Sequence, residues 1–232
     1  MIFQRDALNT VVCNIRIPNG TNEEVGTAIF ISKDNNAFLL TASHVIANIN
    51  PQTYVILSDA SGTPTRVDLS VLLGGASFIN HPTADIAKAQ INKNAANQTY
   101  LKGRCFPYEQ IETNPTTISK DLQLTSIGFP LGLGAIGSTF SPLTFRTFVS
   151  APSITLPRFD NSTPCDFIIL ELPSIGGYSG GPLFDLGYVI SGGMTTTKEH
   201  TILHGIVHGT ISDPTGGKLA AITPCSYLDN WL

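Results

Sequence analysis

A single serine stands in glycine-rich backbone in the stretch GGYSGGP, residues 176–182. Glycine reaches φ > 0 without penalty and lets other groups approach the main chain closely. Because glycine also loses more conformational entropy on folding than other residues, a run of glycines indicates that this backbone conformation is required. One interpretation of Ser179 is a flexible Gly/Ser turn. The other is a nucleophile beside backbone N–H groups that point at developing negative charge, where larger side chains would obstruct them.

A serine hydroxyl is a poor nucleophile at neutral pH and needs a base in hydrogen-bond reach, oriented by a third group. His44 follows an apolar strand pattern in LLTASHVI, and Asp85 opens another in HPTADIAKAQI. Each also has a structural interpretation, because a histidine beside a strand is often a satisfied core residue and an aspartate before a strand is often a turn residue. The residue types therefore suit nucleophile, base and orienting carboxylate, provided that the fold brings them together.

The elements that would position these residues are short strands. Thr, Ser, Asn, Gly, Val and Ile are abundant and long helix formers are sparse, so the composition indicates an all-β protein. Strand patterns of the first part of the chain cover residues 27–32, 37–41, 53–59, 66–75 and 85–91.

A polar stretch with two prolines, residues 92–117, indicates a connection between two halves, and about six further strand patterns follow it. We expect the first half, residues 1–115, to carry His44 and Asp85, and the second, residues 116–232, to carry Ser179. At the end of the chain, apolar residues at i, i+3 and i+4 predict a short amphipathic helix that docks on the body: Leu228, Trp231 and Leu232.

The formal net charge of −4 and the scattered Lys and Arg residues give no electrostatic case for binding nucleic acid or an anionic membrane. No stretch reaches the about 18 apolar residues that a membrane span needs, and the N-terminal residues contain no signal-peptide pattern. We therefore expect a soluble cytoplasmic protein.

Four cysteines lie far apart and lack the CxxC spacing of zinc sites. Free thiols are the expected state of Cys13, Cys105, Cys165 and Cys225, and disulfides stay open as the alternative.

Three histidines at intervals of four, His200, His204 and His208, raise the question of a metal site. Their β-branched neighbours favour a strand, on which consecutive members lie about 13 Å apart, too far to share one ion. We expect neither metal nor cofactor.

The segments TASHV, HPTADIA and GGYSGGPLF, in this order, resemble the three signature blocks of the chymotrypsin/trypsin-like serine peptidases. SIGFPLGLG is similar to a segment of the bacterial HtrA-type branch, although no PDZ domain follows it in the sequence. The resemblance implies two six-stranded antiparallel β-barrels with a cleft between them.

The resemblance also implies roles in peptide-bond hydrolysis through an acyl-enzyme on Ser179. His44 would be the general base and acid, Asp85 would orient it, and the N–H groups of Gly177 and Ser179 would form the oxyanion hole. The implied partner is a protein or peptide substrate, and the oligomeric state stays open.

Two departures from the family pattern matter. Tyr178 stands where the family's zymogens carry an acidic residue that pairs with a freshly cut N-terminus, and no Ile-Val-Gly-Gly activation site exists. We therefore expect activity without N-terminal cleavage.

The expected specificity residues are Pro173 and Ser174, which give no support for a trypsin-like preference for Arg or Lys, together with His208, Gly209 and Thr210. His208 has two open roles: binding a Glu or Gln side chain of the substrate, or bracing Asp85.

Two other interpretations compete. Residues 177–181 also fit the G-x-S-x-G elbow of α/β-hydrolases, but Pro182 and the strand-like residues after it forbid the helix which that fold requires. A catalytically silent relative that uses the cleft to bind peptides stays open as the alternative function.

Overall fold

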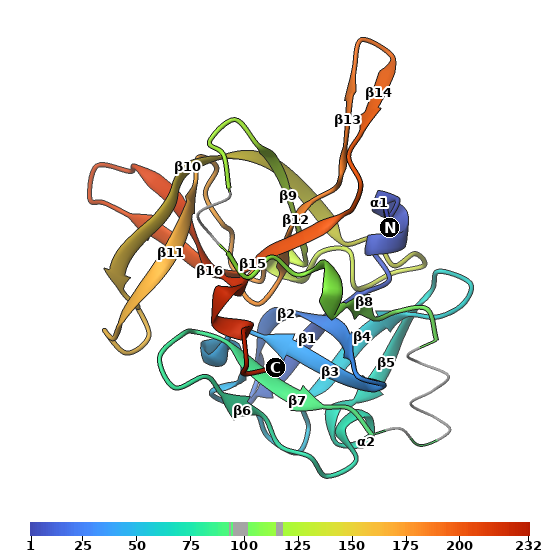
Figure 1. Ribbon diagram of the computed structural model, residues 1–232. Coiled ribbons are helices and arrows are strands. Elements are labelled where there is room, and N and C mark those ends of the chain that lie inside the picture. Colours follow the sequence, from blue (N-terminus) through green and yellow to red (C-terminus); the bar gives the residue numbers. More distant parts are fainter. Residues whose placement is uncertain (93, 95–101, 115–117) are drawn as a thin grey trace.

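Two β-sheet halves lie one above the other in the computed structural model, which describes residues 1–92, 94, 102–114 and 118–232 (Figure 1). The mostly-β, two-sheet architecture expected from the sequence is confirmed. The expected boundary between residues 115 and 116 lies outside the described residues.

The first half contains one sheet in the order β5-β4-β1-β2-β3-β7-β6, with β8 paired in parallel to β2. Its eight strands exceed the expected six, because two of them are only two residues long, and the sheet is not closed as the second one is. The strands are β1 (Val12–Asn19), β2 (Asn22–Lys33), β3 (Asn36–Thr41), β4 (Tyr54–Ser58), β5 (Pro64–Asp68), β6 (Ile79–Asn80), β7 (Ala87–Gln90) and β8 (Phe106–Pro107).

The second half is a closed antiparallel barrel in the order β10-β11-β16-β15-β12-β9, as expected. Beside it, β13 (Tyr188–Ser191) and β14 (Met194–Thr197) form a separate hairpin that projects from the body (Figure 1). The barrel strands are β9 (Gln123–Gly128), β10 (Leu143–Pro157), β11 (Pro164–Leu170), β12 (Pro182–Asp185), β15 (Ile202–Ser212) and β16 (Lys218–Pro224).

Short helical turns link these strands, and one of them corrects the expected strand over residues 66–75. The strand β5 ends at Asp68, and α2 (Leu69–Leu73) follows, because Leu69, Leu72 and Leu73 have helical spacing and are all buried. Gly74, with φ 60, ends the helix in the left-handed conformation. The other turns are α1 (Arg5–Leu8), η1 (Ser43–Ile46), η2 (Tyr108–Gln110), η4 (Pro130–Gly132) and η5 (Cys225–Leu228).

The expected C-terminal amphipathic helix is only the single 3₁₀ turn η5. Asp229 is extended and Asn230 has φ 57, so the helix cannot continue to Trp231. The expected docking is nevertheless present: Leu228 is buried, and Trp231 and Leu232 pack against the same apolar cluster.

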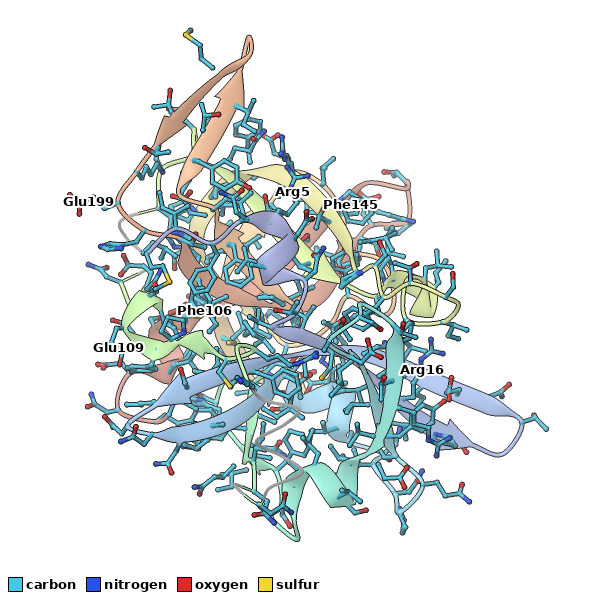
Figure 2. The ribbon with its side chains drawn as sticks, turned by 90° about the vertical axis from the view of Figure 1, so that its right-hand side faces the viewer. Arg5, Arg16, Phe106, Glu109, Phe145 and Glu199 are labelled. Carbon is cyan, nitrogen blue, oxygen red and sulfur yellow. The ribbon has the colours of Figure 1, made fainter. Side chains whose placement is uncertain are left out.

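Apolar residues form three clusters, one inside each half and one between the halves. Phe106 of β8 and Phe184 of β12 belong to the cluster between the halves, with ring centroids 5.1 Å apart. In Figure 2 Phe106 lies at mid-height on the left, between the sheets of the two halves. This shared core fixes the two sheets against each other and so fixes any site that is built from both.

Each end of the chain contacts the half that is distant from it in sequence. The Phe3 N–H donates to Oγ1 of Thr201 in the second half, whereas Trp231 at the other end packs edge-on against His81 of the first half. Both chain ends therefore tie the halves together (Figure 1).

Within the described residues no helix has the length and apolar character needed to cross a bilayer. All four cysteines are free thiols, as expected, and three of them are buried.

Candidate active site

His44 and Asp85 meet at one edge of the first sheet. His44 lies in η1 directly after β3, and Asp85 lies between β6 and β7. Nδ1 of His44 is 2.6 Å from Oδ2 of Asp85, and the His44 backbone N–H donates to Oδ1 at 3.0 Å. Because the carboxylate only accepts, Nδ1 carries the hydrogen and Nε2 is left as the basic nitrogen.

Asp85 is fully buried, and it is shared by two histidines. Nδ1 of His208, on β15, lies 2.5 Å from the same Oδ2. Burial alone would raise the pKa of Asp85, but hydrogen bonds from His208 and His44 outweigh it and hold that pKa well below its ordinary value. Asp85 therefore stays ionised in the folded protein.

The contact with Asp85 corresponds to the bracing role expected for His208. The ring is buried and stacks on Phe167, with centroids 4.8 Å apart. A substrate-binding role through Nδ1 is excluded because that atom is already committed to Asp85. The three donor and acceptor groups of His44, Asp85 and His208 all lie within 4.8 Å, a closeness that their hydrogen bonds explain.

Ser179 lies in the loop between β11 and β12 and lines a cleft of about 570 Å³. His44, on the opposite half, lines the same cleft. The Ser179 hydroxyl donates to the backbone carbonyl of His208 at 3.0 Å, and no hydrogen bond to His44 occurs among the described residues. The fold thus brings Ser179 and His44 to one cleft, but the expected Ser–His hydrogen bond is absent from this conformation.

The glycines around Ser179 set the direction of the loop's backbone groups. The carbonyl of Gly176 accepts from Leu131 N at 2.7 Å, so the N–H of the same planar peptide, that of Gly177, points the opposite way. Gly177 has φ 98, and a Cβ there would lie 2.4 Å from the carbonyl oxygen of Phe129. Only glycine fits this position.

The N–H groups of Gly177 and Ser179 have no acceptor among the described residues. These two unpartnered N–H groups belong to the residues on either side of Tyr178, the positions where the resemblance implies an oxyanion hole.

Tyr178 anchors the loop without a charge. Its side chain is buried, its hydroxyl donates to the carbonyl of Leu143 at 2.7 Å, and its ring stacks on Phe145 with centroids 5.1 Å apart. Uncharged contacts of Tyr178 therefore hold the loop in this structure. An acidic residue at the same position would need a cationic partner instead.

The expected specificity residues Pro173, Ser174 and Thr210 lie together, but they leave little space. The Thr210 hydroxyl donates to the carbonyl of Ser174 at 2.7 Å and so joins the two walls. Ser174 also lines a cavity of about 20 Å³, together with Pro173, Tyr178 and others. This cavity has room for about one water molecule.

Gly209 lies against an aromatic ring from elsewhere in the chain. A Cβ on Gly209 would approach the Phe159 ring to 2.7 Å. Phe159 also lies 5.0 Å from the His44 ring and 4.1 Å from the His208 ring, measured between centroids. Sequence reasoning missed Phe159 and its neighbour Arg158, whose only signal is a charged pair around an aromatic residue in the turn LPRFDNSTP.

Comparison with known families and folds agrees with this geometry. Residues 26–190 match the family described as trypsin-like peptidase domain. No curated protein is similar enough in sequence to match the chain.

Solved structures share the fold at low sequence identity. The chain matches the MamO protease domain from Magnetospirillum magneticum with a TM-score of 0.63 and 15% identity, covering 99% of both chains. It matches the active form of the Rv3671c protease from M. tuberculosis with a TM-score of 0.63 and 17% identity, covering 97% of this chain and 80% of that one.

A third structure is the HtrA-type protease AlgW, solved with a tripeptide, with a TM-score of 0.62 and 21% identity. The match covers 98% of this chain but only 62% of AlgW.

Proposed function

Because the chain belongs to the trypsin-like peptidase domain family, we propose that it is a serine endopeptidase whose nucleophile is Ser179. The observation that carries the proposal is the pair of unpartnered N–H groups at Gly177 and Ser179, beside a cleft that His44 also lines. The proposed substrate is a protein or peptide, a class that the tripeptide in the AlgW structure supports for a relative.

The proposed reaction starts when the Ser179 hydroxyl exchanges the His208 carbonyl for Nε2 of His44, by rotation about its own side-chain bond. Oγ attacks the peptide carbonyl carbon as its proton moves to Nε2. The carbonyl oxygen becomes an oxyanion and accepts hydrogen bonds from the N–H groups of Gly177 and Ser179.

The C–N bond then breaks as His44 gives its proton to the departing amine, which leaves an ester on Oγ. A water molecule, deprotonated by His44, attacks that ester and releases the carboxylic acid and free Ser179. Asp85 stays ionised throughout and stabilises the imidazolium, consistent with its lowered pKa.

A fluorophosphonate tests this proposal without knowledge of the natural substrate. Oγ of an activated serine forms a bond to phosphorus as the P–F bond breaks, and the proton of the hydroxyl passes to His44. We expect one adduct, mapped by mass spectrometry to Ser179, which Ser179→Ala abolishes. Ser153→Ala is the matched control, because Ser153 is exposed on β10 and should leave labelling unchanged.

The alternative is a silent relative that binds peptides in the cleft. One observation favours it: the Ser179 hydroxyl is held by the His208 carbonyl and not by His44. A folded wild-type protein that gives no adduct over a pH range of 5 to 9, yet binds peptides, would overturn the enzymatic proposal in favour of this one.

A further inference from the structure

An arginine from the second half reaches the carboxylate of the proposed catalytic site. Arg158 stands at the end of β10, and its side chain is only 4% exposed. Its Nη1 donates to the carbonyl of Thr83 at 3.0 Å, and its Nη2 donates to Oδ1 of Asp85 at 3.2 Å. Both acceptors belong to the loop of the first half that carries Asp85.

The arginine is itself fixed by the turn that follows it. Nε and Nη2 of Arg158 donate to the two carboxylate oxygens of Asp160 at 2.8 and 2.5 Å. The Arg158 N–H donates to the carbonyl of Thr163, and its own carbonyl accepts from Ser162 N, which closes the turn before β11. A planar guanidinium held at one edge by a carboxylate presents its other edge in a fixed direction.

With these contacts the Asp85 carboxylate reaches its full number of hydrogen bonds. Oδ2 accepts from the two imidazoles, and Oδ1 accepts from the His44 N–H and from Arg158. A carboxylate has about four acceptor sites, so all of them are used. The donors come from η1, from β15 and from the turn directly after β10, and the carboxylate cannot rotate without breaking contacts to both halves.

The same contact places a positive charge beside the proposed catalytic carboxylate. A positive charge next to Asp85 partly neutralises the carboxylate to which His44 is hydrogen-bonded. Among the described residues, the other charged or titratable groups that contact Arg158 or Asp85, or that line a pocket together with His44, are His208, Asp160, Cys165, His81, Glu23 and Glu24.

We infer that Arg158 is a positioning residue of the proposed active site, which fixes the Asp85 carboxylate from the opposite half and holds a positive charge beside it. This inference rests on the proposed serine-peptidase function. Arg158 touches neither the substrate nor Ser179, so its effect passes through Asp85.

The test follows the second-order rate constant of fluorophosphonate labelling against pH in wild type, Arg158→Met and Arg158→Lys. The rate falls on the acid side as His44 becomes protonated. We expect Arg158→Met to move this acid limb upward by about 0.5 to 1 pH unit and to lower the plateau about tenfold. Arg158→Lys, which keeps the charge, should return the limb close to its wild-type position.

Arg66→Met is the matched control, since Arg66 is 58% exposed on β5 and contacts Asp68 and the Tyr54 ring away from Asp85. Thermal unfolding checks that each variant is folded. Should Arg158→Met fail to fold, Arg158→Gln decides: it replaces the charge by a neutral amide, so the acid limb should again move to higher pH. A folded Arg158→Gln protein whose acid limb coincides with that of wild type contradicts the inference.

A folded Arg158→Met protein whose acid limb coincides with that of wild type refutes the positioning role and leaves the proposed function intact. A wild-type protein that fails to react at all refutes the proposed function, and the inference with it. The two failures are therefore distinguishable.

Discussion

Replacement of Gly177 by alanine tests the proposed oxyanion hole directly. The backbone at this position has φ 98, and a Cβ would lie 2.4 Å from the carbonyl oxygen of Phe129, whereas real Cβ contacts stay beyond 3.0 Å. The obstructing atom belongs to the main chain, so no side-chain rotation relieves the contact. The peptide that carries the Gly177 N–H must turn instead.

The expected cost has two parts. The unfavourable φ and the contact should destabilise the protein by about 1 to 3 kcal/mol, measured by urea unfolding. Loss of one oxyanion donor should slow the chemical step by about 100- to 1000-fold. The assay for the second part is the rate constant of fluorophosphonate labelling at a pH above the acid limb.

Gly75→Ala separates strain from function. Gly75 has φ 93, nearly the same as Gly177, but a Cβ there would meet nothing within 4 Å. This variant should lose stability and label at the wild-type rate. A folded Gly177→Ala protein that labels within about threefold of wild type would refute the assignment of its N–H to the oxyanion hole.

Two further outcomes are expected. Thr210→Gly removes the hydrogen bond to Ser174, which lines the small cavity, and should enlarge that cavity, so that peptides with a large apolar side chain before the cleaved bond gain at least about tenfold in kcat/KM over those with alanine; an unchanged ratio would contradict the role of this hydrogen bond in closing the cavity. The pKa of Asp85 is lowered in the folded state, so ionised Asp85 stabilises the fold fully at pH values above its unfolded pKa of about 4. This stabilisation, on the order of 3 kcal/mol, is lost as the pH falls below that value. The free energy of unfolding should fall less steeply between pH 5 and 2 in Asp85→Asn, and equal slopes would refute this account.

The sequence predicted the parts of the fold that depend on local patterns. Strand patterns predicted the sheet of the first half, and the family resemblance of the blocks around His44 and Asp85 implied that this half carries both residues, which meet at 2.6 Å. The pattern over residues 66–75 misled because β-branched and apolar residues suit either element there, and burial of Leu72 and Leu73 decided for a helix.

Contacts that depend on tertiary approach could not be read from the sequence. Arg158 is 73 positions from Asp85, and its turn resembles any polar hairpin until the second half packs on the first. The partner of the Ser179 hydroxyl, the His208 carbonyl, is likewise set by the packing of β15 against the loop, which residue types and spacing do not specify.

Asp85 accepts hydrogen bonds from both halves of the protein, and this has a consequence for the folding chain. The first half supplies the acid and the imidazole, and the second supplies the alcohol and the two donors that complete Asp85. Until the later-synthesised barrel has docked, the proposed reaction centre does not exist. The proposed proteolytic activity therefore requires both halves to be folded and docked on each other.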